Sequence, residues 1–246
     1  MKPTWTSDCG SVDLYLGDCL DVLDGIDETF ESVVADPPYG MNYQSTWSIG
    51  GPRFDVIEND TLPATQWVSR CDFKCSVVFC EWRNSEEFRV ALSSGDCPVR
   101  SQLVWDRCSH GMGDLKTVFS PRHDLAWWSC RSGYQFPKDR PASVLRFPRV
   151  AASKMLHPTQ KPVELIEYIV DHVCKKSGTV LDPFMGSGTT GVACANLNRK
   201  FVGIEINEEY FNIAKRRIQK ALGEDYTDKH GTIHRSLFNQ KGMSNE

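Results

Sequence analysis

The residues best suited to chemistry form the segment Asp36-Pro37-Pro38-Tyr39, which directly follows the apolar run Val33 to Ala35. The β-branched residues predict a buried strand, and Pro37 ends it because proline cannot donate to a sheet ladder. Ligands of open α/β sheets bind at the carboxyl ends of strands. A planar ligand with an exocyclic amino group fits this corner, because Asp36 and a prolyl carbonyl can accept its N–H groups while Tyr39 stacks on its ring. On its own, the segment equally fits an ordinary strand-ending turn.

A second segment, residues 186–191, has the sequence Gly-Ser-Gly-Thr-Thr-Gly and the glycine spacing of a nucleotide-binding turn. Glu205 ends the next predicted strand, nineteen residues after Gly186, where an acid that binds ribose belongs. No lysine follows the glycines, so the turn is not a phosphate-binding P-loop. NAD and S-adenosylmethionine (AdoMet) both fit this pattern. Asp182 favours AdoMet, because a carboxylate before the turn repels a pyrophosphate but can pair with an amino group or a sulfonium.

Alternating strands and helices must position these segments, and they predict an α/β fold. The predicted strands cover residues 12–18, 32–38, 76–82, 101–105, 124–130, 179–182 and 201–205, and the helices cover 19–31 in part, 64–72, 162–176, 189–196 and 207–222. Residues 41–63 form a long polar loop that leaves the Asp36 corner, so we expect a lid over that site. Residues 223–246 are polar and weakly patterned, which predicts a loose tail.

Composition narrows the class of protein. The 246 residues fit one large α/β domain with an insertion. No apolar run is long enough for a membrane span, and the amino-terminal residues lack the apolar core of a signal peptide, so we expect a cytoplasmic protein with no membrane partner. The ten cysteines lack the spacing of a zinc site, so we expect reduced core cysteines and no metal.

Charge is distributed unevenly along the chain. Residues 1–99 carry 6 Lys/Arg against 17 Asp/Glu (net −11), whereas residues 100–154 carry 10 against 4 (net +6). A basic middle in an acidic chain favours a polyanionic partner, although a solvated surface is the plain alternative. Aromatic residues are interleaved there with basic ones, and aromatics can stack on unpaired bases. The candidate DNA-binding residues are Arg107, His110, Lys116, Arg122, Arg131, Lys138 and Arg140.

The order of these motifs resembles that of the beta-class DNA amino-methyltransferases, the N6-adenine and N4-cytosine enzymes of restriction–modification systems and bacteriophages. The match covers residues 12–222: a Gly-Asp strand end, Asp-Pro-Pro-Tyr, a basic middle, His-Pro-Thr-Gln-Lys-Pro at 157–162 and Asp-Pro-Phe-x-Gly-Ser-Gly-Thr-Thr at 182–190. The sequence differs from such relatives at Trp105-Asp106-Arg107 and His123-Asp124, within the part expected to recognise the target.

The resemblance implies a circularly permuted, Rossmann-like AdoMet-dependent fold: a mostly parallel twisted sheet with helices on both faces and a loop-rich target-recognition insertion. The implied domains are a catalytic one over 1–105 and 155–222, the insertion over 106–154 and the tail over 223–246. The implied catalytic residues are Asp36, Pro37, Pro38 and Tyr39. The implied cofactor-binding residues are Asp18, Asp36, His157, Thr159, Lys161, Asp182, Phe184, Gly186, Ser187, Gly188, Thr189 and Glu205.

The implied function is transfer of a methyl group from AdoMet to N6 of an adenine flipped out of double-stranded DNA. Adenine is favoured because relatives whose corner begins with Ser more often act on cytosine N4, and N4-cytosine methylation is the alternative. A catalytically silent DNA-binding protein and an NAD-dependent dehydrogenase are weaker alternatives. A homodimer and a cognate restriction enzyme are the other partners that the resemblance allows.

Overall fold

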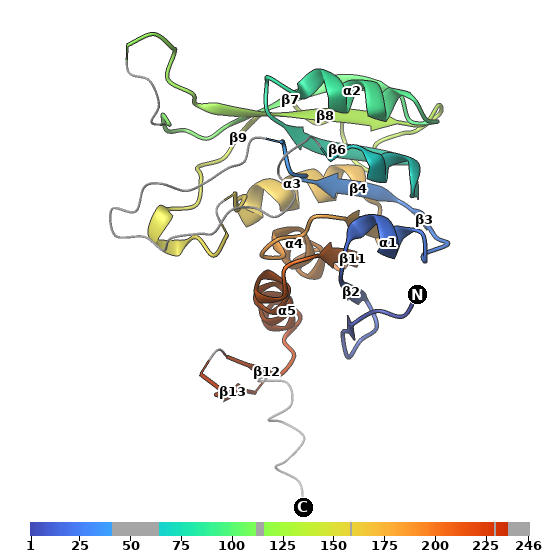
Figure 1. Cartoon of the computed structure of the whole chain (residues 1–246), viewed down its shortest axis with the longest axis vertical. Coiled ribbons are helices and arrows are strands. Elements are labelled where there is room, and N and C mark those ends of the chain that lie inside the picture. The colour runs from blue at the N-terminus through green and yellow to red at the C-terminus, as the bar shows by residue number, and fades with distance from the viewer. Residues whose placement is uncertain (41–63, 112–115, 158, 229, 236–246) are drawn as a thin grey trace, which may run out of the picture.

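One sheet lies at the centre of the molecule (Figure 1). The computed structural model describes residues 1–40, 64–111, 116–157, 159–228 and 230–235. Within these ranges the main sheet is nine-stranded, in the order β1-β2-β11-β10-β4-β6-β8-β7-β9. Its strands are β1 (Trp5–Thr6), β2 (Val12–Leu16), β4 (Ser32–Ala35), β6 (Cys75–Cys80), β7 (Val99–Asp106), β8 (His123–Cys130), β9 (Val144–Arg146), β10 (Thr179–Asp182) and β11 (Lys200–Glu205).

The middle of this sheet is parallel, as the sequence predicted. Strands β2, β11, β10, β4 and β6 pair in parallel in that order, and β8 pairs antiparallel with both β6 and β7. Strands β10 and β4 are neighbours in the sheet, but the strands that follow them lie on opposite sides of this pair. The strand after β10, β11, lies on one side, and the next main-sheet strand after β4, β6, lies on the other. Ligands bind at such a switch point, outside the carboxyl ends of the two strands. The Asp36 corner and the glycine turn both lie there, in the permuted order that the resemblance implied.

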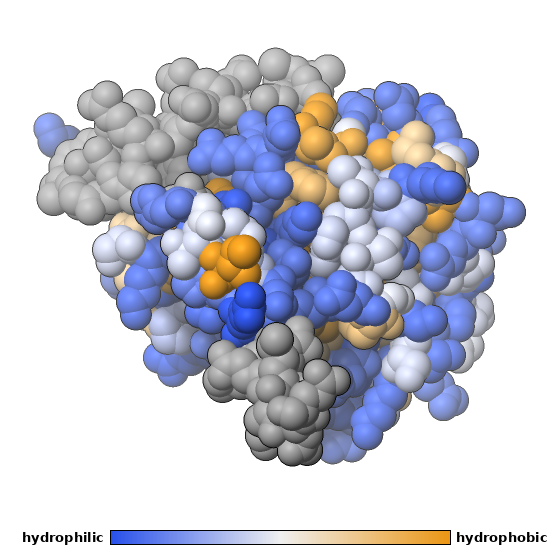
Figure 2. All heavy atoms as spheres, turned by 90° about the horizontal axis from the view of Figure 1, so that it is seen from below, coloured by the Kyte–Doolittle hydropathy of each residue, from blue (hydrophilic) through white to orange (hydrophobic). Residues whose placement is uncertain are grey.

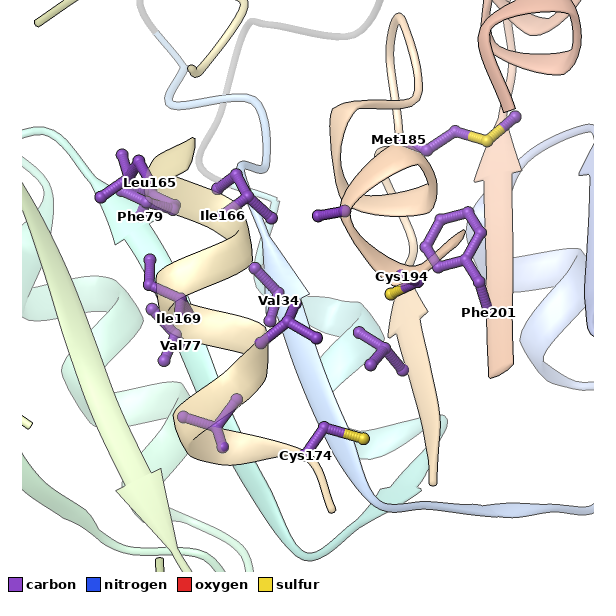
Figure 3. Close-up of a cluster of buried hydrophobic side chains, with 14 of the residues drawn as sticks. Val34, Val77, Phe79, Leu165, Ile166, Ile169, Cys174, Met185, Cys194 and Phe201 are labelled. Carbon is purple, nitrogen blue, oxygen red and sulfur yellow. The ribbon is translucent and has the colours of Figure 1, made fainter. Parts of the chain in front are cut away.

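Helices cover both faces of the sheet. One face carries α1 (Cys19–Leu23), the 3₁₀ helix η1 (Gln66–Ser69) and α2 (Ser85–Ser93); the other carries α3 (Val163–Val173), α4 (Thr189–Asn196) and α5 (Glu208–Leu222). Side chains alternate along β4, so that Val33 packs on the first face and Val34 on the second. Figure 3 shows Val34 beside Ile166 and Ile169 of α3. Each such buried aliphatic side chain contributes about 1.5–3 kcal/mol.

The structure corrects two of the predicted elements and adds a helix that was not predicted. Residues 64–72 form only η1, because the chain extends again at Asp72–Phe73 (β5) to pair with Thr29–Phe30 (β3). Helix α2 was not predicted, since only two of its side chains are buried and the helical period is weak. The predicted loose tail contains a short hairpin of β12 (Tyr226–Thr227) and β13 (Ile233–His234). The predicted lid at 41–63 lies outside the described residues.

The predicted recognition insertion is partly built into the sheet. Strand β8 pairs with β6 and β7 along its length because Ala126, Trp128 and Cys130 are buried in the core. Outside the sheet lie the β7–β8 connection and the chain between β8 and β9, followed by a 3₁₀ helix, η2 (Ala152–Lys154). The division into a catalytic domain and an insertion remains a prediction.

The surface opposite the β7–β9 end is mostly hydrophilic. Figure 2 shows this face, seen from below in the orientation of Figure 1, with only separate small hydrophobic spots. Among the described residues, no helix has both the length and the apolar character needed to cross a membrane. All ten cysteines are free thiols.

Candidate active site

The carboxyl ends of β4 and β10 face one cavity, and both predicted segments line it. The cavity is open to solvent, and the space between its walls, open solvent included, is about 440 Å³. Its walls come from the end of β4, the chain before α3 and the turn after β10. The lining residues are Val34, Ala35, Asp36, Phe79, His157, Thr159, Gln160, Lys161, Ile166, Asp182, Phe184, Met185, Gly186, Ser187, Thr189 and Thr190.

Two side chains hold the Asp36 carboxylate in place. Lys161 Nζ lies 2.5 Å from Asp36 Oδ2, and the Tyr39 hydroxyl donates a hydrogen bond to Oδ1. The Lys161 side chain is 9% exposed and that of Asp36 19%, so the ion pair is largely removed from water. A carboxylate has about four acceptor positions, so both oxygens retain capacity for N–H groups of a ligand. Lys161 was predicted to lie near the cofactor, and the structure places it against the Asp36 carboxylate.

Aromatic rings surround the Lys161 ammonium on its other sides. Nζ lies 4.8 Å from the centre of the Phe79 ring and 6.0 Å from that of Trp105. Cation–π attraction at these distances favours a fixed position for the ammonium. The Trp105 ring is itself held by a 2.8 Å hydrogen bond from Nε1 to the Phe147 carbonyl. The end of β7 therefore packs directly against the catalytic corner.

Tyr39 is fixed at three points. Its hydroxyl binds Asp36, its ring packs edge-on against Phe88, and the Asn84 side-chain amide donates to its carbonyl. Burial and the negative charge of Asp36 raise the pKa of the Tyr39 phenol well above its ordinary value, so the hydroxyl stays protonated. Sequence reasoning missed Asn84, since no pattern marks a buried amide before a helix. The stacking role of Tyr39 remains a prediction.

The prolyl carbonyls of the corner differ in their hydrogen bonds. The Pro38 carbonyl accepts a 3.1 Å hydrogen bond from Ala64 N–H. The Pro37 carbonyl accepts none from the residues that the structure describes. Pro37 and Asp36 thus present two acceptors at the end of β4.

The glycine turn is held by the acid that was predicted to bind ribose. Gly186 N–H donates to Glu205 Oε2 at 2.8 Å, and Asn207 N–H donates to Oε1 at 2.9 Å. Gly186 has φ +50°, and a Cβ there would lie 3.3 Å from His157 Nε2. Gly188, predicted to line the cofactor, instead packs against α5: a Cβ on it would lie 2.7 Å from that of Ala214.

Arg217 of α5 forms hydrogen bonds with the glycine turn. It was not identified from the sequence. Its guanidinium donates to the Ser187 carbonyl at 2.5 Å, to Ser187 Oγ at 3.0 Å and to Thr189 Oγ1 at 3.3 Å. Burial lowers its pKa. The only signal in the sequence is that Arg217 flanks the apolar stripe of α5 between Ala214 and Ile218.

Asp182 is buried at the end of β10 and uses both carboxylate oxygens. Oδ1 accepts from Phe184 N–H at 3.1 Å, and Oδ2 accepts from Thr190 Oγ1 at 2.6 Å. Burial, with a smaller contribution from the negative charges of Asp36 and Glu205, raises the pKa of Asp182 to about 7. An added negative charge next to Asp182 is therefore unfavourable.

The free energy of unfolding of Asp182→Asn, relative to that of wild type, should increase as pH rises. The folded-state pKa lies above the unfolded-state value of about 4, so unfolding releases a proton between pH 4 and 7 and wild-type stability falls over that range, by about 4 kcal/mol from this group. Asparagine removes this loss. Urea unfolding at pH 5, 6, 7 and 8 measures the difference, with the exposed Asp27→Asn as control. A difference between Asp182→Asn and wild type that stays constant with pH would contradict the assignment.

His157 is neutral at pH 7 and forms the wall facing the glycine turn. Burial lowers its pKa to about 4. Thr159 N–H donates to His157 Nδ1 at 3.3 Å, so the proton of the neutral ring resides on Nε2, on the side of Gly186. The ring is held by an edge-to-face contact with Tyr210, with centroids 4.4 Å apart. Thr159 and Phe184, both predicted, also line the cavity.

Asp18 lies at the same edge of the sheet but outside the cavity lining. It is the N-cap of α1, with Oδ1 accepting from Leu20 N–H at 2.8 Å. The preceding Gly17 N–H donates to the Glu205 carbonyl at 2.9 Å. Asp18 is therefore positioned beside the end of β11.

The predicted DNA-binding residues fall into two groups. Arg107, His110, Lys116 and Arg122 lie in the β7–β8 connection, at the edge of the sheet where β4 and β10 end. Because β8 runs antiparallel, Arg131 lies at the opposite edge, where it pairs with Asp72. Lys138 pairs with Asp171 near the end of α3, and α3 leads away from the cavity. Arg140 lies in the same chain between β8 and β9 as Lys138. The structure does not bring Arg131 and Lys138 to the cavity, and DNA binding by the first group remains a prediction.

Comparison with known proteins gives a consistent set of relatives. A family model described as DNA methylase, of the N6/N4 type, matches residues 30–216. Type II methyltransferase M2.LlaDCHI of Lactococcus lactis subsp. cremoris is 52% identical over 226 residues, covering 78% of this chain and 83% of the relative. Type II methyltransferase M2.DpnII of Streptococcus pneumoniae is 49% identical over 225 residues, with the same coverage.

Solved structures agree in fold. The M1.HpyAVI–SAM complex superposes with a TM-score of 0.64 at 26% identity, covering 84% of this chain and 99% of that one. The cytosine-N4-specific PvuII DNA methyltransferase superposes with a TM-score of 0.68 at 17% identity, covering 88% of each chain. The second likeness concerns the fold alone.

Proposed function

Since the chain belongs to the N6/N4 DNA methylase family, we propose that it transfers a methyl group from AdoMet to N6 of an adenine flipped out of DNA. The observation that carries transfer to an exocyclic amino group is the corner itself, and its start at Asp36 rather than at a serine favours adenine over cytosine. It begins with Asp36, paired to Lys161, and adds the Pro37 carbonyl as a second acceptor. Two acceptors at one strand end fit the two N–H bonds of an exocyclic amino group.

The cavity fits a cationic cofactor better than an anionic one. Asp182 and Glu205 bring negative charge to the glycine turn, and their mutual repulsion contributes to the raised pKa of Asp182. His157 is neutral and does not offset this charge. AdoMet supplies a methyl group already activated on a positively charged sulfur. Glu205 beside Gly186 would hold the ribose, and Phe184 and His157 would enclose the cofactor.

The chain's own residues then have mainly a positioning task. The lone pair of N6 is delocalised into the adenine ring, so N6 is a poor nucleophile. Hydrogen bonds from its two N–H groups, one to Asp36 and one to Pro37, favour a pyramidal nitrogen and localise the pair. The new N–C bond forms as the S–C bond breaks, sulfur keeps the bonding electrons, and Asp36 or water accepts the proton that N6 loses. Fixing the two reactants in line lowers the barrier by roughly 7–11 kcal/mol.

A base inside a duplex cannot reach this cavity, so the target must leave the helix, which costs a few kcal/mol of unstacking. The basic β7–β8 connection stands at the cavity edge, where it can contact the phosphates that flank the target. A cognate restriction enzyme and a homodimer remain predictions.

Product analysis tests the proposed function. The purified protein is incubated with methyl-tritiated AdoMet and unmethylated plasmid DNA, the DNA is digested to nucleosides, and the label is separated by chromatography. We expect it in N6-methyldeoxyadenosine. Label in N4-methyldeoxycytidine would contradict the adenine assignment. The absence of label in any nucleoside, with AdoMet bound, would favour a catalytically silent DNA-binding protein.

A further inference from the structure

We propose that Phe119 inserts into the DNA base stack at the target site, where its ring fills the space that the flipped base leaves. The inference deepens the proposed function and rests on it, because it assumes that the target base leaves the duplex. Phe119 is not among the residues that the sequence marked as functional.

The Phe119 side chain is fully exposed. Its exposed fraction is 102%, the largest of the exposed hydrophobic side chains in the described part of the chain, and the neighbouring Val118 is 58% exposed. Burying a phenylalanine contributes about 1.5–3 kcal/mol in a core, and this one contributes none of it to the fold. Adjacent exposed apolar side chains on a polar surface mark a contact with a partner.

The segment that carries Phe119 is anchored by hydrogen bonds where it joins the rest of the β7–β8 connection. Gly111 N–H donates to the Pro121 carbonyl at 2.6 Å, and Ser120 Oγ donates to the Gly111 carbonyl at 3.0 Å. Arg107 also donates to the Pro121 carbonyl, at 2.9 Å. Phe119 is therefore held close to a fixed part of the chain, which reduces the conformational entropy that insertion would cost.

The anchored start of the β7–β8 connection follows the end of β7, which packs near the Asp36 corner. Trp105, two residues before Arg107, faces the Lys161 ammonium that pairs with Asp36. Arg107 in turn pairs with Asp124 at the start of β8, with 3.3 Å between charged atoms. Figure 1 shows the β7–β8 connection on the same side of the sheet as the chain leaving β4. A duplex that delivers a base to Asp36 would approach this edge of the sheet, where the connection can reach it.

The charges around Phe119 match DNA. Arg122 lies three residues after Phe119, and Arg146, with a 73% exposed side chain, lies at the end of strand β9 beside β7. Both pair with Asp106, which leaves one positive charge in excess among the three side chains. Arginine beside an apolar wedge is the combination with which proteins hold the phosphates and enter a base step. The cationic and aromatic groups thus favour a DNA duplex as the occupant.

The test compares two duplexes built on the site at which the wild-type enzyme methylates plasmid DNA. In one, the target adenine is paired with thymine; in the other, it faces an abasic position and is already unpaired. Single-turnover rates with tritiated AdoMet are measured for wild type, Phe119→Ala, Phe119→Trp and Ile233→Ala. Ile233 is a matched control, because it is 65% exposed and lies on the hairpin after α5.

We expect Phe119→Ala to slow methylation of the paired duplex by about 10- to 100-fold, which corresponds to the free energy of stacking one base on an aromatic side chain. Methylation of the abasic duplex should slow by less than about threefold. Phe119→Trp and Ile233→Ala should stay within about threefold of wild type on both. Unchanged rates for Phe119→Ala, or equal losses on both duplexes, would overturn the inference and leave the proposed function intact. A wild-type protein that methylates no DNA would overturn the proposed function, and the inference with it.

Discussion

Replacing Asp36 by alanine should abolish methyl transfer, lowering the single-turnover rate by about 1,000-fold or more. The substitution removes the acceptor that orients N6 and leaves only the Pro37 carbonyl, so the nitrogen is no longer held in line with the methyl group. Asp36 faces the amino group in this account, so AdoMet affinity should stay within about threefold. Rapid-quench assays measure transfer, and calorimetry measures cofactor binding.

Two further variants separate loss of the catalytic group from loss of folding. Asp24→Ala removes an exposed aspartate that pairs with Arg70 and should leave the transfer rate unchanged. Asp36→Ala also leaves the Lys161 ammonium without its partner, so folding is checked by circular dichroism, and Asp36→Asn/Lys161→Met serves as a second inactive variant without that charge. Wild-type turnover in either Asp36 variant would refute the catalytic assignment.

Lys161→Met should lower the free energy of unfolding by about 3–5 kcal/mol, the cost of leaving a largely buried charge without its partner. Transfer should fall as well, because the Asp36 carboxylate loses one of the two groups that fix it. Adding Asp36→Asn to Lys161→Met removes the unpaired charge, so the double variant should regain most of the stability but none of the activity. Urea unfolding and transfer assays on the same samples separate the two effects.

The control for this prediction is Lys138→Met. Lys138 pairs with Asp171 at the surface and its side chain is 52% exposed, so its loss should cost no more than about 1 kcal/mol. A Lys161→Met variant as stable as Lys138→Met would contradict the buried ion pair. Restored activity in the double variant would contradict the role of Asp36.

Much of the fold could be predicted because the parallel strands are short apolar runs that end in recognisable chemistry. Strands β4 and β10 are each followed within two residues by a proline, Pro37 and Pro183, which cannot donate to a sheet ladder. The order of the motifs then determines that two segments about 150 residues apart meet at one switch point. Residues 36–39 and 182–189 were found for this reason.

The remaining features depend on packing that the sequence pattern does not reveal. Arg217 and Asn84 bind main-chain carbonyls of the turn and the corner, and such contacts leave no periodic trace. The direction of β8 decides that Arg131 and Lys138 leave the cavity, although their charges and spacing resemble those of the basic residues that stay. Phe119 is one exposed residue in a polar segment, and its proposed role rests on the position of the β7–β8 connection, which only the structure shows.

The central claim is that Asp36 and the glycine turn form one site in which adenine N6 meets the methyl donor. The most direct measurement is a crystal structure with sinefungin, an AdoMet analogue that carries an amine in place of the transferable methyl group, and a duplex containing the target site. The account predicts adenine N6 within hydrogen-bond distance of an Asp36 oxygen and of the Pro37 carbonyl, with the sinefungin amine beside N6 and its ribose at Glu205. A target base bound away from Asp36, or an analogue bound outside the turn at 184–189, would contradict it.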